Sequence, residues 1–185
     1  MKKFIFSFVL CIMSITGFVY NAHALNPYAV MQEAKNGLVG SQFLLGVLYS
    51  TGAESDVIEP NPHKAREWYE KAAQQGHPAA QYLLGSIYET GQFVDRDIKK
   101  AVMWYEKAAN NGITNAQFRM GEFYEKGLGV EQDIEKAIAW YKKAATQNNL
   151  EAQAKLKKLQ KTAEAVTPQP EAPQTAETTA AQPAR

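Results

Sequence analysis

The residues of this chain that could take part in chemistry are few and widely spaced. The chain holds three histidines and one cysteine, Cys11. His63 and His77 lie at the starts of predicted helices, where a histidine is typically an exposed residue of the capping region. The chain contains no Ser-x-x-Lys and no His-Glu-x-x-His, so neither an activated serine nor a zinc protease site is indicated. We therefore predict no catalytic residue.

The acidic and glycine-rich segments lack the spacing of a ligand site. The three acidic residues between Gly52 and Asn61 are too irregularly placed to form a calcium loop. The segment Gly127-Leu128-Gly129 lacks the rest of a phosphate-binding fingerprint. We therefore predict no metal ion and no cofactor.

The N-terminal segment has the pattern of a signal peptide. Lys2 and Lys3 precede a mainly apolar run, Phe4 to Tyr20, and Ala22-His23-Ala24 has the small-x-small pattern of a cleavage site. We predict a signal peptide at 1–24, cleaved between Ala24 and Leu25, and a periplasmic or secreted mature protein that is not membrane-embedded. The alternative is an uncleaved anchor, but the run is short and no basic cluster follows it.

Net charge bears on the class of partner, and cysteine content bears on how the chain is stabilised. The chain has 20 basic and 19 acidic residues, and loss of Lys2 and Lys3 leaves 18 against 19. This balance disfavours a nucleic-acid binder, which needs a basic face. Cys11 would leave with the signal peptide, so the mature chain would have no disulfide and its stability must come from packing.

A block of the form Trp-Tyr-x-Lys-Ala-Ala occurs three times, each copy 36 residues after the last. The copies begin at Trp68, Trp104 and Trp140. A period of this length indicates helical hairpins stacked into an array. Small alanines beside large rings suit close helix packing, so we predict that these aromatic residues are packing residues. The alternative is a platform for a sugar or an aromatic ligand.

A different helix precedes each block and carries Gln-aromatic-x-x-Gly-x-x-Tyr. Its glycines are Gly46, Gly85 and Gly121, and the spacing places aromatic, glycine and tyrosine on one helical face. A glycine inside a helix costs about 1 kcal/mol relative to alanine. We therefore predict that a neighbouring helix passes too close to these glycines for a β-carbon.

The helix boundaries recur in one register. Asn61, Asp97 and Asp133 are predicted N-caps of the second helices, and Pro62 suits the first helical position. The second helices are predicted to end at residues that tolerate a left-handed backbone, namely Gly76, Gly112 and Asn148. The loop from Gly52 to Asn61 is three residues longer than its counterparts. It is either a recognition edge or a tolerated surface insertion.

These patterns predict an all-α protein, an α-solenoid of antiparallel helix pairs with eight helices over residues 26–161. The predicted domain at 25–161 holds three full repeats and two terminal half units. The repeats are predicted at about 41–76, 80–112 and 116–148, and the capping helices at 27–36 and 150–161. Residues 162–185 are rich in Thr, Ala, Gln, Pro and Glu and predict a disordered tail, either passive or a tether.

Taken together, the motifs resemble the Sel-one-like repeat (SLR) family, a relative of the tetratricopeptide superfamily. The matching patterns are Ala-Gln-aromatic-x-Leu-Gly-x-x-Tyr, Gly-x-Gly-Val-x-x-Asp and Lys-Ala-x-x-Trp-Tyr-x-Lys-Ala-Ala. The copy from Ala116 to Ala145 matches almost throughout, with Met120 in place of leucine, and the second departs at Gln92-Phe93, where Leu-Gly is expected. The resemblance implies a right-handed superhelix that serves as an adaptor in assembling protein complexes.

The resemblance also implies rival functions. A cysteine-rich exported branch of the family is described as binding or hydrolysing β-lactams, but its disulfide pattern is missing here. Exported members are further linked to envelope biogenesis, signalling or host contact. Our leading prediction is an exported, non-catalytic interaction scaffold. The alternatives are a cell-wall-related hydrolase or β-lactam-binding protein, and a secreted effector that acts on host proteins.

Partner-binding residues are predicted from the positions that vary among the first helices, which in the superfamily line the concave groove. Two such positions lie one turn apart on one face of the helix. In the three repeats the first position holds Leu44, Leu83 and Arg119, and the second holds Val47, Ser86 and Glu122. We predict that a partner polypeptide binds there, with the leucines and Val47 as anchors and the two charged residues setting register. The alternative is that Leu44 and Leu83 are ordinary core residues.

Overall fold

The chain folds as a row of antiparallel helices. The computed structural model describes residues 26–52 and 57–166, and within them it contains helices and no strand. The predicted signal peptide and most of the predicted tail lie outside the described residues. The helices are α2 (Pro27–Lys35), α3 (Val39–Thr51), α4 (Pro62–Gln74), α5 (Pro78–Thr90), α6 (Ile98–Asn110), α7 (Thr114–Lys126), α8 (Ile134–Thr146) and α9 (Leu150–Val166).

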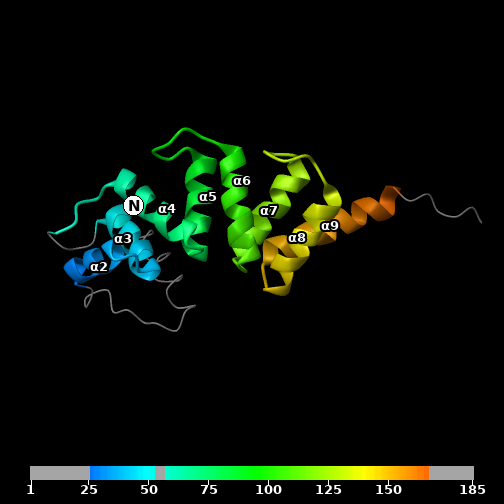
Figure 1. The fold of residues 1–185 in the computed structure, drawn as a ribbon. Helices are drawn as coiled ribbons and strands as arrows, with labels where there is room; N and C mark the ends of the chain where they lie inside the picture. Colours follow the sequence, from blue (N-terminus) through cyan, green and yellow to red (C-terminus); the bar gives the residue numbers. More distant parts are fainter. Residues whose placement is uncertain (1–25, 53–56, 167–185) are drawn as a thin grey trace, which may run out of the picture.

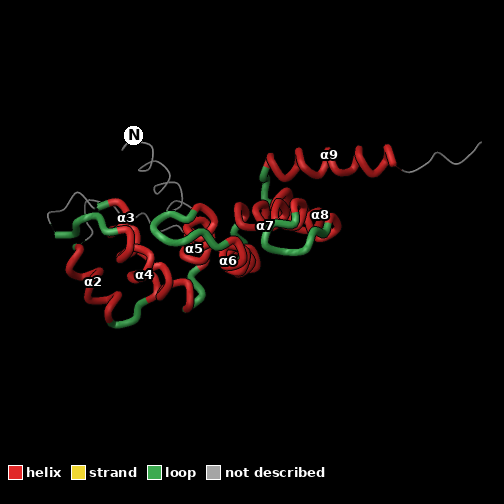
Figure 2. Tube along the Cα trace, turned by 90° about the horizontal axis from the view of Figure 1, so that it is seen from above, coloured by secondary structure: helices red, strands yellow, loops and turns green. Residues whose placement is uncertain are grey.

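The helices stand side by side in chain order (Figure 1), and the extensive contacts are all between helices that are consecutive in the chain. The pairs α3–α4, α5–α6 and α7–α8 form the three predicted repeats, and α2 and α9 flank them as the predicted half units. This arrangement confirms the all-α solenoid. At the far end of the array, α9 extends past α7 and α8 (Figure 2). It continues to Val166, so the capping helix is longer than the predicted 150–161.

Close packing of the two helices of each repeat depends on the predicted glycines. A β-carbon at Gly46 would lie 2.6 Å from the Tyr69 ring, and one at Gly85 would lie 2.8 Å from the Tyr105 ring. Gly121 meets the Tyr141 ring in the same way. Real β-carbons do not approach so closely, so a ring from the second helix occupies the space that any larger residue would need.

Both kinds of predicted cap are present. The side chains of Asn61, Asp97 and Asp133 accept hydrogen bonds from backbone N–H groups three residues later, at 3.0, 3.0 and 2.9 Å. Each satisfies a donor that the helix itself leaves unpaired. The residues that follow the second helices are left-handed, with φ of 90° at Gly76, 87° at Gly112 and 63° at Asn148.

A buried glutamine in each first helix joins consecutive helix pairs. The Nε2 groups of Gln42, Gln81 and Gln117 donate to the carbonyl oxygen eight residues earlier, in the preceding helix. Their Oε1 atoms accept from the amide groups of Gln75, Asn111 and Gln147 at 2.6, 2.8 and 2.8 Å. Each glutamine therefore links its own helix to both neighbouring second helices, one before and one after it in the chain.

The enlarged first loop is fixed to the core at its end. Ile58 is only 3% exposed and packs in a cluster with Val30, Leu45 and Leu48. The backbone N–H of Asn61 donates to the carbonyl of Tyr49 at 2.7 Å. Equivalent bonds close the loop between α5 and α6 and the loop between α7 and α8. The part of the loop after residue 56 is thus structural, while residues 53–56 at its tip lie outside the described residues.

Candidate functional site

The predicted partner-binding residues fall into two groups. Leu44 and Leu83 are half-buried and pack against core clusters. Val47 is 9% exposed and belongs to the core itself, where it contacts the cluster that includes Tyr69 and Trp104. This burial counts against the predicted role of Val47 as an anchor, because its side chain packs between helices. The structure favours the alternative that the two leucines are core residues, although part of each remains accessible.

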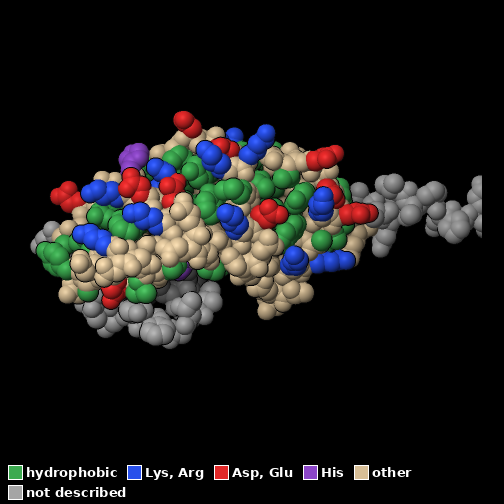
Figure 3. Space-filling view, in the orientation of Figure 1, with side chains coloured by type: hydrophobic (Ala, Val, Ile, Leu, Met, Phe, Trp, Pro, Cys, Tyr) green, Lys and Arg blue, Asp and Glu red, His purple; other side chains and the backbone are tan. Residues whose placement is uncertain are grey.

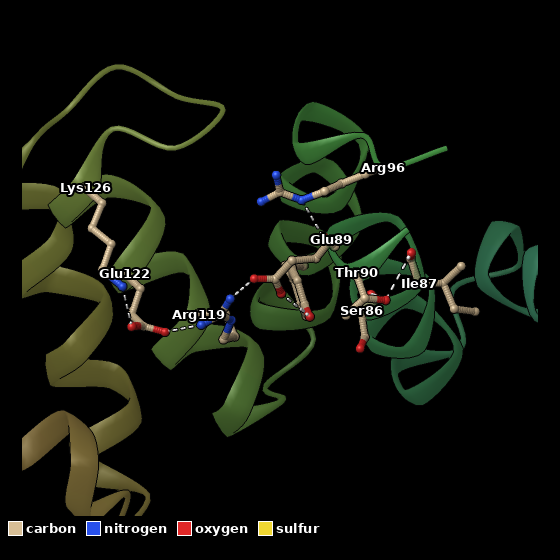
Figure 4. Close-up of polar contacts among 9 residues, drawn as sticks. Ser86, Ile87, Glu89, Thr90, Arg96, Arg119, Glu122 and Lys126 are labelled. Atoms are coloured by element: carbon tan, nitrogen blue, oxygen red, sulfur yellow. Dashed lines mark hydrogen bonds and ion pairs between the residues drawn. The ribbon is translucent and has the colours of Figure 1, made fainter. Parts of the chain in front are cut away.

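Arg119 and Glu122 instead belong to a network of charges on α7 (Figure 4). The Arg119 guanidinium bridges Glu122 on its own helix and Glu89 on α5. Glu89 also accepts a hydrogen bond of 2.9 Å from the Tyr105 hydroxyl, and Glu122 is held by Lys126 at 3.0 Å. Burial raises the pKa of the Tyr105 hydroxyl, so it remains a donor.

The same arrangement recurs one repeat later. The Tyr141 hydroxyl donates to Glu125 at 2.5 Å, and Lys155 of α9 donates to the same carboxylate oxygen at 2.8 Å. Burial acts to raise the Glu125 pKa, but the hydrogen bonds from Lys155 and Tyr141 outweigh it and hold the pKa below its usual value. A tyrosine, a glutamate and a basic residue thus join each of these repeats to the next.

The first junction lacks this arrangement. Ser50 occupies the position of Glu89 and Glu125, so no carboxylate is present there to accept from the Tyr69 hydroxyl. Leu83 occupies the position of Arg119 and Lys155. The change from apolar to charged side chains along the first helices therefore reflects how successive repeats are joined, in addition to any partner preference.

Two adjoining hollows lie between the first helices α5 and α7 and the capping helix α9. The first encloses about 490 Å³ and is lined by Tyr82, Asn115, Phe118, Arg119, Asn149 and Glu151. The second encloses about 470 Å³ and is lined by Phe118, Glu122, Glu151, Ala154, Lys155 and Lys158. We call the two together the α7 trough. Of the six predicted residues, Arg119 and Glu122 line it, and the other four do not.

The trough owes its shape to a missing ring. Phe43, Tyr82 and Phe118 occupy one position of the first helices, and α9 has Ala154 at this position. Because alanine leaves the Phe118 side uncovered, space opens there. The Phe118 and Tyr82 rings also pack within their repeats, where they contact the Tyr141 and Tyr105 rings with centroids 5.6 and 5.5 Å apart. Aligning α9 with the first helices would have revealed the gap.

Each tryptophan of the three repeats has a lysine of its own helix over its ring. In each Trp-Tyr-x-Lys block the lysine ammonium lies over the indole of the same helix, 3.9 Å from the Trp68 ring, 4.4 Å from Trp104 and 3.9 Å from Trp140. These contacts cover one face of each indole with a cation. The described residues also contain no cluster of three potential metal ligands, and none of their helices is long and apolar enough to span a membrane.

A family model describes most of this architecture. The Sel1 repeat model matches residues 39–77, 78–113 and 114–149. The chain belongs to the Sel1 repeat family. The matched segments agree with the three helix pairs, and the Sel1 repeat fold is generally a scaffold for protein–protein interaction. No curated protein is significantly similar to the chain in sequence.

Solved structures agree with the Sel1 assignment. A Sel1 repeat protein from Oxalobacter formigenes is 39% identical, with a TM-score of 0.66, over 71% of this chain and 96% of the other. A protective antigen of uropathogenic Escherichia coli with an SLR fold is 35% identical, with a TM-score of 0.64, over 70% of this chain and 27% of that protein. The cysteine-rich protein B of Helicobacter pylori, at 20% identity and a TM-score of 0.53, shares the fold.

Proposed function

We propose that this Sel1 repeat protein is an exported scaffold that binds a segment of a partner polypeptide in the α7 trough. The observation that carries the proposal is the trough itself, which spans the first helices α5 and α7 and the capping helix α9. Its two hollows share Phe118 and Glu151 in their linings. A recess bordered by two rings and several charged side chains offers both apolar contact and hydrogen bonding to an extended chain.

Charge and surface composition support a protein partner over a nucleic acid. Basic and acidic side chains are interspersed over the visible face of the array (Figure 3). A phosphate backbone requires a basic stripe, whereas mixed charges suit a polypeptide with both signs of charge. Export is proposed from the basic-apolar-small pattern of residues 1–24.

Site-specific photocrosslinking in cells that produce the protein tests this proposal. A benzophenone amino acid at Asn115 or Ala154 would report polypeptides in the trough, and one at Lys142, exposed on α8, serves as the control. We expect a discrete crosslinked partner from the two trough positions, in the envelope or secreted fraction, and none from Lys142. Crosslinks of equal intensity from all three positions, or from none, would contradict binding in the trough.

A further inference from the structure

The first hollow of the α7 trough gathers polar side chains that have no partner in the described part of the chain. The Tyr82 hydroxyl, the Asn115 amide and the Glu151 carboxylate make no hydrogen bond or ion pair there. The neighbouring polar groups are engaged: Asn149 accepts a hydrogen bond of 2.7 Å from the Ala152 backbone, and Arg119 is held by two glutamates. The hollow therefore has unused hydrogen-bonding capacity in three side chains around Phe118.

The unbalanced side-chain charge of this hollow is negative. Arg119 is the cation in its lining, and its charge is matched by Glu89 and Glu122. Glu151 is exposed and has no ion-pair partner among the described residues. The backbone N–H groups at the start of α9 carry a partial positive charge of about half a unit, and Glu151 in the first turn more than offsets it. A ligand that complements the charge of this hollow would therefore be positively charged.

Two aromatic rings complete the recess. Tyr82 of α5 and Phe118 of α7 occupy equivalent positions one repeat apart, and both are half-buried, so part of each ring faces the hollow. Their contacts with Tyr105 and Tyr141 hold the rings in place. A cation that is planar and rich in N–H donors can stack on such rings while it donates to a carboxylate, an amide oxygen and a phenol oxygen.

We propose that the first hollow binds an arginine side chain of the partner polypeptide, with the guanidinium stacked beside Tyr82 and Phe118 and paired with Glu151. This inference rests on the proposed function, because it assigns the chemistry of the residue that enters the trough. Arginine is favoured over lysine because a guanidinium offers five N–H donors in one plane. These can reach the three unused acceptors of the hollow, namely the phenol, amide and carboxylate oxygens.

Nuclear magnetic resonance titration of the mature protein tests the inference with capped tripeptides as probes. We expect Ala-Arg-Ala to shift the backbone resonances of residues 115–119 and 149–151, and Ala-Glu-Ala to leave them unchanged. Glu151→Gln should weaken binding of the arginine peptide by about three- to fivefold, the size expected for an exposed ion pair. Added salt should also weaken binding of the arginine peptide to the unmodified protein.

Glu135→Gln is the matched control. Glu135 is the second residue of α8, as Glu151 is of α9, and it is also exposed. It does not line the trough, so this variant should bind the arginine peptide as the unmodified protein does. Shifts caused equally by the glutamate peptide, or equal binding by both variants, would overturn the inference. If crosslinking at Asn115 still succeeded, only the arginine assignment would fail, whereas loss of both results would also remove the proposed function.

Discussion

At the scale of single residues, the recurrent positions of this chain act through contacts between helices. The glycines of the first helices are explained by the tyrosine rings that touch them, and the glutamines by carbonyl groups in the preceding helix. Both residue types carry a cost at these sites, because glycine weakens a helix and a buried amide must find hydrogen-bond partners. Their recurrence was visible in the sequence, but the partner of each glutamine was not, since its hydrogen bonds cross to other helices.

The glycine contacts can be tested by adding one methyl group. Gly85→Ala should lower the free energy of unfolding by about 1–2 kcal/mol, because overpacking against Tyr105 exceeds the gain in helix propensity. Gly40→Ala is the control, since nothing lies within 4 Å of a β-carbon there and Gly40 is also helical. It should raise stability by about 0.5 kcal/mol. Urea unfolding followed by circular dichroism measures both, and equal effects would contradict the packing argument.

The glutamine links allow a second paired comparison. Gln117→Met keeps the side chain's length and leaves the Ala109 carbonyl and the Gln147 amide without this partner, so it should cost about 1–3 kcal/mol. Gln153→Met removes the equivalent bond to Ala145 at an exposed site, where water can replace it. Its effect should stay within about 0.5 kcal/mol. Similar losses for the two variants in urea unfolding would show that burial does not set the cost.

At the scale of helices, the sequence predicted order and boundaries well and accessibility poorly. Caps and left-handed ends depend on a few adjacent residues, so Asn61, Asp97 and Asp133 could be recognised directly. The burial of Val47 was not predicted, because it arises in a core cluster formed with residues of later helices, which no local pattern reveals. The end of α9 was placed too early because composition changes at residue 162, whereas the first residue that breaks a helix is Pro168.

The ion pair between α7 and α9 gives the element-scale prediction. Because the folded-state pKa of Glu125 lies below its unfolded value, its stabilising contribution is present above the unfolded pKa and is lost as pH falls through the folded pKa. Lys155→Met should therefore cost about 0.5–1 kcal/mol near neutral pH, discounted for partial exposure. The difference should shrink below about pH 4.

Lys157→Met is the control for that prediction, since it removes the same charge from an exposed position of α9. Urea unfolding at several pH values should show little difference between this variant and the unmodified protein at any of them. A Lys155 effect that is independent of pH, or one matched by Lys157, would indicate that loss of net charge and not the bond to Glu125 is responsible.

At the scale of the whole molecule, the array ends where its packing rule is broken. Each inner first helix has a glycine that receives a tyrosine of the next helix, and α9 has Lys157 at this position. A lysine side chain would occupy the space that the ring needs, and its charge favours water over a packed helix. The repeat architecture was predictable because its period is written three times, but the trough was not, since it arises where the period fails at Ala154.

Extending the array tests this account of its end. A second copy of residues 114–149 inserted after Asn149 would keep the 36-residue register and place a glycine-bearing helix before each added tyrosine. Because stability in such arrays is nearly a sum of repeat and interface terms, the insertion should raise the urea midpoint and the m-value together. The same 36 residues placed after Val166 would follow α9, whose Lys157 blocks stacking, and should raise neither the urea midpoint nor the m-value. Equal stabilisation by the two insertions would show that Lys157 does not close the array.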